Sequence, residues 1–251
     1  MAINVILALM IIGSFLLAIV LHESGHALMA SMLGDPTPRA EGRQSFSLAT
    51  QLDALGTILC LILAFQPVLF GPVGLGWGKP VKTDPWKLRG GPNGGTLLVA
   101  LAGPIFSMII GLLFALLLRF LFGLQFLNQI SPPVLLWLAT HFLQLLTVFA
   151  SVNICLALFN LLPFYPLDGY QIVYTLLPTR QAVQFAKSAP YGPFIVLGIF
   201  FLLPFLAQIS GSGLNDLFIF HIPAYLLAGS LSIVGLVTGQ PLAVGIHYFL
   251  P

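Results

Sequence analysis

The sequence predicts an all-α polytopic membrane protein, and two observations lead to this fold class. Hydrophobic residues make up 58% of the 251 residues and charged residues only 6%, whereas charged residues are about a quarter of an average soluble domain. The mean hydropathy is +1.02, and the apolar residues gather in several runs long enough to cross a bilayer. Because backbone polar groups must be satisfied internally in lipid, these runs are expected to be helices.

We expect about five to six transmembrane helices, with a re-entrant segment and a short β-hairpin near the cytosolic side. All of these belong to a single membrane-embedded domain over residues 1–251. The formal net charge of +2 is small and dispersed, so no nucleic-acid partner is expected. Cys60 and Cys155 both lie within apolar runs, which favours buried thiols over a disulfide.

The first apolar run, residues 3–21, has Asn4 and Ser14 as its only polar residues. A helix over this run would rise about 28 Å, close to the thickness of a bilayer core. It lacks the basic start and the small-residue cleavage site of a secretory signal, so we interpret it as a retained helix. The run continues into the motif HESGH at residues 22–26, and three ionisable side chains in a membrane helix indicate a functional role.

The HESGH motif has the spacing of a metal-binding helix. His22 and His26 lie one turn apart on the same face, so both imidazoles can reach one metal ion, and Glu23 lies beside them as a candidate base. A catalytic zinc site typically has three protein ligands. Asp168 is our candidate for the third, because an unpaired carboxylate at the end of a long apolar run would be costly. The alternative is that Asp168 caps the following helix and faces water.

The rest of the chain alternates between apolar runs and polar connections. Residues 34–52 form a polar connection, and the Gly-, Pro- and Lys-rich residues 71–91 suit turns, with the hairpin expected at residues 72–84. Trp77 and Trp86 are expected to be interfacial anchors, with substrate contact as the alternative. No internal repeat is evident, so an inverted-repeat transporter gains no support. The further apolar runs lie at residues 52–70, 96–122, 133–162, 191–209 and 216–237.

A second motif, NLLPFYPLDG at residues 160–169, follows HESGH in the chain. Together the two motifs resemble the site-2 protease family of intramembrane zinc metalloproteases. Shorter matches, at residues 34–38, 42–43, 53–57, 76–81 and 102–104, resemble its compact bacterial branch without PDZ or CBS domains. The resemblance covers residues 15–177, so we expect a catalytic core over residues 1–177 and two additional transmembrane helices over residues 178–251.

The resemblance implies a ligand set and supporting residues. It implies one Zn²⁺ per chain, bound by His22, His26 and Asp168, with Glu23 activating water. It assigns site-arranging or substrate-binding roles to Asn160, Pro163 and Pro166, and Asn153 is a further candidate. Asn160 could instead only end its helix, Asn153 could only join two helices, and the prolines could only open the chain. We expect packing or interface roles for His221 and His247, and His141 should lie far from the metal.

Two departures from the family pattern stand outside the ligand set. Ser107 occupies a position where the family usually has Asn, and residues 48–50 replace an expected Asn-Pro pair. We expect both departures to affect substrate positioning more than metal binding.

The two motifs must meet at one depth, so an odd number of spans should separate their helices. Of the two intervening runs, residues 52–70 are the weaker span and the candidate for the re-entrant segment. Arg119 then lies on one side of the membrane and the other basic residues on the opposite side, which the positive-inside rule makes cytosolic. These other residues are Arg39, Arg43, Lys79, Lys82, Lys87, Arg89, Arg180 and Lys187.

We therefore expect an intramembrane zinc endopeptidase of the bacterial plasma membrane, with its active site toward the cytosol. Its expected substrates are single-span or signal-anchor membrane proteins, cut within the lipid bilayer in regulated intramembrane proteolysis. The alternative is a non-hydrolytic zinc-binding membrane protein or a transporter. The intact Glu23 argues against the first of these, and the lack of a repeat argues against the second. No feature of the sequence indicates an oligomeric state.

Overall fold

The computed structural model describes residues 5–65, 74–124, 132–210 and 221–240. It is mostly helical, which confirms the predicted fold class at this level. Within these described residues, four helical segments are long and apolar enough to cross a membrane: α1 (Val5–Met32), α5 (Gly91–Gly123), α6 (Pro133–Asn160) and the helical segment Thr179–Ala207. The protein is an integral membrane protein.

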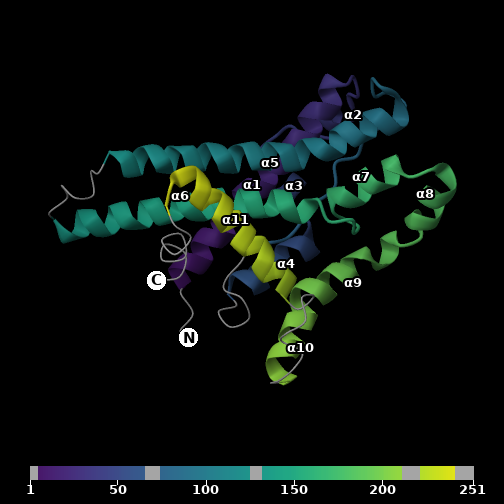
Figure 1. The fold of residues 1–251 in the computed structure, drawn as a ribbon. Helices are drawn as coiled ribbons and strands as arrows, with labels where there is room; N and C mark the ends of the chain where they lie inside the picture. Colours follow the sequence, from purple (N-terminus) through teal and green to yellow (C-terminus); the bar gives the residue numbers. More distant parts are fainter. Residues whose placement is uncertain (1–4, 66–73, 125–131, 211–220, 241–251) are drawn as a thin grey trace.

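The centre of the fold is formed by α1, α5 and α6. The long helices α5 and α6 run side by side, and α1 crosses behind them (Figure 1). Ile11, Phe15 and Ile19 of α1 are fully buried and share one core cluster with Leu156 and Phe159 of α6. This packing places the second half of α1, which carries HESGH, against the other two helices.

A short, irregular region follows α1. It contains α2 (Thr37–Ala40), α3 (Leu48–Gln51) and α4 (Ala54–Ala64), and Asp53 caps α4 by accepting a hydrogen bond from the Gly56 N–H at 3.0 Å. The 11 residues of α4 rise about 16 Å, which is too short for a span. Residues 66–73 lie outside the described residues, so the re-entrant segment stays a prediction.

The hairpin expected at residues 72–84 is not confirmed. Where the structure describes this stretch, from residue 74 onward, it shows an extended segment with one isolated antiparallel bridge, between Gly78 and Leu52, and no sheet. Pro80 and Pro85 contribute to this outcome, because proline cannot donate to a strand ladder.

After α6 the chain turns through residues 161–167 into a series of shorter helices. These descend from one end of the molecule, where α7 and α8 lie, and α11 crosses the bundle (Figure 1). The predicted runs at residues 191–209 and 216–237 are largely helical where they are described. The expected number of five to six transmembrane helices stays a prediction. The helices are α7 (Asp168–Leu176), α8 (Thr179–Ala186), a 3₁₀ turn (Ala189–Tyr191), α9 (Gly192–Leu197), a π-helical turn (Gly198–Leu202), α10 (Leu203–Ser210) and α11 (Ile222–Thr238).

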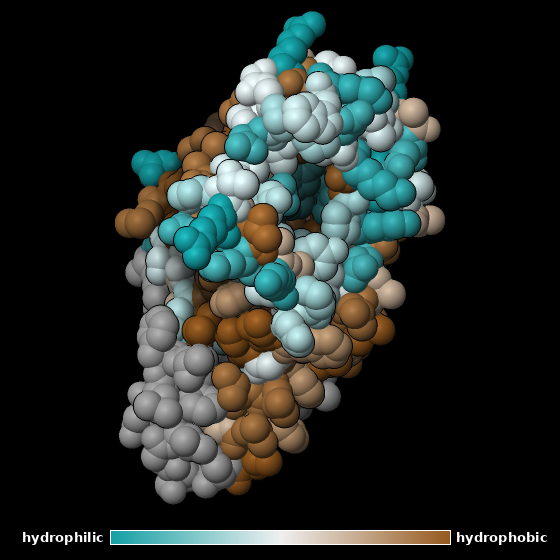
Figure 2. Space-filling model, turned by 90° about the vertical axis from the view of Figure 1, so that its right-hand side faces the viewer, coloured by the Kyte–Doolittle hydropathy of each residue, from teal (hydrophilic) through white to brown (hydrophobic). Residues whose placement is uncertain are grey.

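The surface is divided into a polar end and an apolar body. Figure 2 shows hydrophilic residues gathered around a hollow at one end and hydrophobic residues covering the part below it. Leu113 and Phe120 of α5 and Val134 and Trp137 of α6 are more than half exposed. Side chains of this kind on long helices are suited to contact with lipid.

Candidate metal centre and active site

Three metal-binding side chains meet where α1 faces the start of α7. His22 Nε2 lies 2.9 Å from Asp168 Oδ2, His26 Nε2 lies 3.1 Å from Asp168 Oδ1, and the two Nε2 atoms are 3.3 Å apart. One ligand atom from each residue lies within 4.8 Å of the others. The Asp168 side chain is only 18% exposed, so it does not face water as a simple helix cap would.

The outer nitrogen of each imidazole is held by α5. His26 Nδ1 lies 2.7 Å from the Val99 carbonyl oxygen, which can only accept, so Nδ1 carries the proton and Nε2 is left to bind a metal. His22 Nδ1 lies 2.9 Å from Ser107 Oγ, and in the metal-binding tautomer it donates to that hydroxyl. Both rings are thereby oriented with Nε2 toward Asp168.

Gly103 provides the space between these two contacts. A Cβ atom at this position would overlap His26 Nε2 and lie 2.8 Å from His22 Nε2. Val99, Gly103 and Ser107 are four residues apart, so they share one face of α5 behind the imidazoles. Two His and one Asp suit zinc, and Gly103 leaves the tips of the imidazoles uncovered, so the residues present fit this metal.

Glu23 lies next to the ligands and is 5% exposed. Its Oε2 atom is buried and has no hydrogen-bond partner among the described residues. Gly78 of the extended segment packs directly on the carboxylate, since a Cβ atom there would overlap Oε1 and lie 2.8 Å from Cδ. A buried carboxylate with one unpartnered oxygen is suited to accept a proton from a water molecule in the site.

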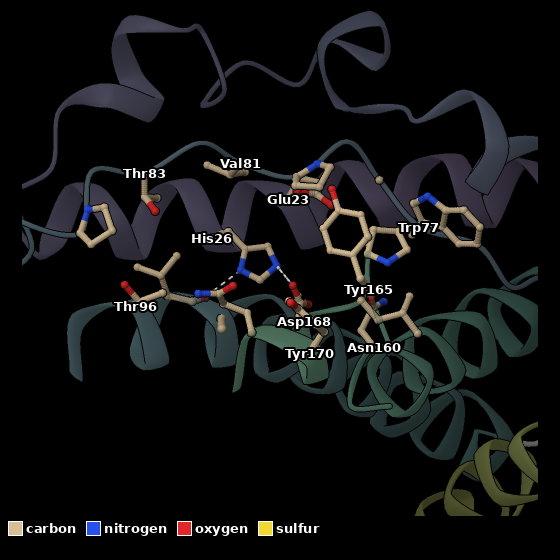
Figure 3. Close-up of a pocket in the computed structure, with 18 residues that line it drawn as sticks. Glu23, His26, Trp77, Val81, Thr83, Thr96, Asn160, Tyr165, Asp168 and Tyr170 are labelled. Carbon is tan, nitrogen blue, oxygen red and sulfur yellow. Dashed lines mark hydrogen bonds and ion pairs between the residues drawn. The ribbon is translucent and has the colours of Figure 1, made fainter. Parts of the chain in front are cut away.

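A cavity of about 340 Å³ opens beside these groups, and both Glu23 and Asp168 line it. Thr83 and Thr96 lie toward one end, and Trp77, Tyr165 and Asn160 lie toward the other (Figure 3). The Thr96 hydroxyl is buried and has no hydrogen-bond partner among the described residues. The cavity therefore has a hydroxyl-bearing end and an aromatic end, with the candidate ligands between them.

Comparison with known proteins agrees with this geometry. The model of Peptidase family M50 matches residues 76–205. The chain belongs to peptidase family M50, the site-2 protease family. This M50 chain is 31% identical over 193 residues to "Putative zinc metalloprotease YwhC" of Bacillus subtilis (strain 168), covering 76% of this chain and 79% of that protein.

A second M50 relative is "Putative zinc metalloprotease Rip2" of Mycobacterium tuberculosis (strain ATCC 25618 / H37Rv). It is 29% identical over 199 residues, which is 78% of this chain and 68% of that protein. No solved structure gives a significant match to this chain. The family establishes that the protein is a membrane metalloprotease.

Of the remaining predicted site residues of this M50 protease, two line the cavity and two do not. Asn160 and Pro166 line the cavity, and the Asn160 amide donates to the Leu156 carbonyl at 2.9 Å. Pro163 lies in the turn after α6 and does not line the cavity. Asn153 is fully buried within α6, where its amide donates to the Phe149 carbonyl at 2.8 Å, and it is also not part of the cavity wall.

One sequence-based expectation about this M50 protease was wrong. Trp77 is 3% exposed and lines the cavity, so it is not an interfacial anchor, whereas Trp86 is 83% exposed. Ser107 contacts a candidate ligand, so this departure from the family pattern lies at the metal centre, and its effect on substrate positioning stays a prediction. In the sequence, the spacing of four residues between Gly103 and Ser107 indicates that they share one helix face. It does not indicate that this face lies against the histidines.

Two of the other histidines, His141 and His221, lie apart from the cavity. His141 is half-buried on α6, with Nδ1 2.9 Å from the Trp137 carbonyl oxygen. His221 immediately precedes α11. His247 lies outside the described residues. Neither His141 nor His221 lines the cavity.

Proposed function

We propose that this M50 protein is an intramembrane zinc endopeptidase that hydrolyses single-span or signal-anchor membrane proteins near the cytosolic face. The observation that carries the proposal is the convergence of His22, His26 and Asp168 within 4.8 Å, beside the unpartnered carboxylate oxygen of Glu23. A non-hydrolytic zinc-binding protein would need only the three ligands. A buried base next to them, on the wall of a cavity, is what hydrolysis requires in addition.

The residues divide the reaction between them. Zinc held by His22, His26 and Asp168 would lower the pKa of a water molecule and polarise the scissile carbonyl. Glu23 accepts the proton of the water as its oxygen adds to the carbonyl carbon, and then gives that proton to the leaving amine as the C–N bond breaks. Asn160, on the cavity wall, supplies an amide that can hydrogen-bond the developing oxyanion or the substrate backbone.

The extended segment supports binding of an unwound substrate. The Lys79 N–H donates to the Gln51 carbonyl at 2.7 Å, so this residue faces α3. The N–H and C=O groups of successive residues point to opposite edges of an extended chain. Those of Gly78 therefore point away from α3, toward the cavity that Gly78 lines. A substrate strand could pair with this edge and so satisfy the backbone groups that it loses on leaving its own helix.

The orientation follows from the distribution of basic residues. The polar end of the molecule, with its hollow, contains α2, α7 and α8 (Figures 1 and 2). Arg39, Arg180 and Lys187 belong to these helices or follow them directly, whereas Arg119 lies near the far end of α5. The positive-inside rule therefore supports a cytosolic location for the cavity. Both relatives named above are bacterial proteins, which supports the bacterial plasma membrane as its location.

The test is cleavage of a single-span substrate by the purified protein in proteoliposomes. Glu23→Gln should keep stoichiometric zinc and lose at least about 10³-fold in activity, because the base is removed and the ligands are not. Asp168→Ala should lose both zinc and activity. The matched control is Glu41→Gln, at an exposed glutamate in the connection after α1, which should behave as wild type.

Each other outcome contradicts a definite part of the proposal. Wild-type cleavage by Glu23→Gln with zinc still bound would exclude Glu23 as the base. Purified wild-type protein without stoichiometric zinc would exclude the metal centre. Bound zinc with no cleavage of any membrane substrate would favour a non-hydrolytic zinc-binding protein.

A further inference from the structure

Arg43 is a buried cation outside the ligand set. It lies between α2 and α3 and is 4% exposed. Its guanidinium donates to the carbonyl of Thr50, and to those of Lys79 and Pro80 at 3.1 Å each. No carboxylate in the described part of the chain lies within 4.0 Å of it. A buried charge is costly, so three carbonyl acceptors in the plane of one guanidinium mark a specific arrangement.

The same loop makes further contacts with the extended segment. The Gln51 side-chain amide donates to the Arg43 carbonyl at 2.7 Å, and the Gln51 carbonyl accepts from the Lys79 N–H at 2.7 Å. Leu52 forms the single antiparallel bridge to Gly78. The Arg43 guanidinium and the Gln51 carbonyl therefore tie the loop over residues 43–52 to residues 78–80, and the Gln51 side chain holds the loop together at the Arg43 carbonyl. We refer to these two side chains and their contacts as the Arg43 brace.

The braced segment lies directly on the candidate base. Gly78 precedes Lys79 and Pro80, two of the three residues whose carbonyls bind the guanidinium, and it packs against the Glu23 carboxylate. Gly78 and Pro80 also line the cavity. If residues 78–80 moved away, Glu23 would lose the backbone that restricts its side chain, and the cavity would lose one wall.

We propose that Arg43 is a positioning residue, which holds Gly78 against Glu23 through the carbonyls of Lys79 and Pro80. This role rests on the proposed peptidase function, since it concerns the placement of the base and of the substrate-facing wall. Arg43 contacts none of His22, His26 and Asp168, so zinc binding should not depend on it. A displacement of about 1 Å in such a group can cost about 100-fold in rate.

The first experiment compares full-length Arg43→Ala, Arg43→Lys and wild-type protein, with Arg39→Ala as the control at an exposed arginine of α2. Arg43→Ala should retain stoichiometric zinc and lose about 10- to 100-fold in kcat. Low millimolar guanidinium chloride should restore part of that loss, whereas equal NaCl or urea should not. Arg43→Lys should stay impaired, because an ammonium group cannot replace a planar fork over three carbonyls.

The second experiment does not depend on catalysis. Hydrogen exchange at the amides of residues 77–79 and 81 should be about tenfold faster or more in Arg43→Ala than in wild type, and unchanged in Arg39→Ala. Unchanged exchange in Arg43→Ala would overturn the brace even if the peptidase function holds. A loss of activity that is accompanied by loss of zinc, and is insensitive to guanidinium, would also overturn it, because Arg43 would then support the fold alone. Failure of wild-type cleavage would refute the proposed function instead, and the exchange result would still decide the brace.

Discussion

The hydrogen bond between Ser107 and His22 predicts a change in zinc affinity. Ser107 is fully buried, and its Oγ lies 2.9 Å from His22 Nδ1. In Ser107→Ala the ring keeps its place in the helix but loses this partner. Without metal, His22 can move its proton to Nε2 and donate to Asp168, which lies 2.9 Å away. With metal bound at Nε2, the proton must stay on Nδ1, where it now has no acceptor.

The cost therefore falls mainly on the metal-bound state. A buried donor left without a partner costs about 1–3 kcal/mol, and about 1.4 kcal/mol corresponds to a tenfold change in an equilibrium constant. We expect Ser107→Ala to weaken zinc binding about 10- to 100-fold, the range typical of residues that orient metal-binding histidines. Ser107→Thr, which keeps the hydroxyl, should recover much of the affinity.

The measurement is the zinc dissociation constant of purified protein, obtained by competition with a chromogenic chelator, together with the absorption spectrum of the Co²⁺-substituted site. The control is Ser151→Ala, which removes a buried serine of α6 that donates to its own helix, at the Val148 carbonyl. Equal zinc affinity in Ser107→Ala and wild type would refute the orienting role. An equal loss in Ser151→Ala would show that packing, rather than this hydrogen bond, is responsible.

Two further predictions concern a glycine and an acid. Gly103→Ala should abolish stoichiometric zinc binding, because its Cβ atom would overlap an imidazole nitrogen. The control is Gly94→Ala in the same helix. A Cβ atom at Gly94 has nothing within 4 Å, so this variant should bind zinc normally in the same metal analysis. Burial raises the pKa of Asp35, but hydrogen bonds from Thr37 and the Asp84 N–H together lower it by more, so its net pKa lies below the ordinary value of 3.8. The ionised Asp35 side chain therefore stabilises the folded state fully above pH 3.8, and this stabilisation is lost as the pH falls below that value. In thermal unfolding, Asp35→Asn should be less stable than wild type at about pH 6, and the difference between them should be smaller near about pH 3. A constant difference across this range would contradict the assignment.

The meeting of His22, His26 and Asp168 was predictable because its signals in the sequence are local. His22 and His26 are related by helical periodicity, and the cost of an apolar environment singles out Asp168. The wall behind the imidazoles was not predictable in the same way. Val99 acts through its backbone carbonyl, which any residue provides, and Ser107 becomes informative only once α5 is known to face α1.

Trp77 shows why a pattern of composition can mislead. Tryptophan near the end of an apolar run is typical of a membrane interface, and Trp86 meets that expectation by its exposure. Trp77 is instead drawn into the fold by backbone packing, since a Cβ atom at Gly56 would overlap the Trp77 backbone and one at Gly76 would overlap the Gly56 carbonyl. Only the tertiary contact between α4 and the extended segment distinguishes the two tryptophans.

Close backbone approach is the common requirement of the whole site. Gly103 lies against the two imidazoles and Gly78 against Glu23, and a Cβ atom at Gly169, next to Asp168, would overlap the carbonyls of Leu161 and Leu162. Gly103 and Gly78 thus reach the imidazoles and the Glu23 carboxylate only because they lack a side chain, and Gly169 lets the chain beside Asp168 pack closely on residues 161 and 162. A Cβ atom at any of these glycines would displace the side chain or backbone that it meets, while the core cluster around Phe15 and Phe159 stays packed. The catalytic geometry should therefore be more sensitive to alanine at residues 78, 103 and 169 than the stability of the helical bundle.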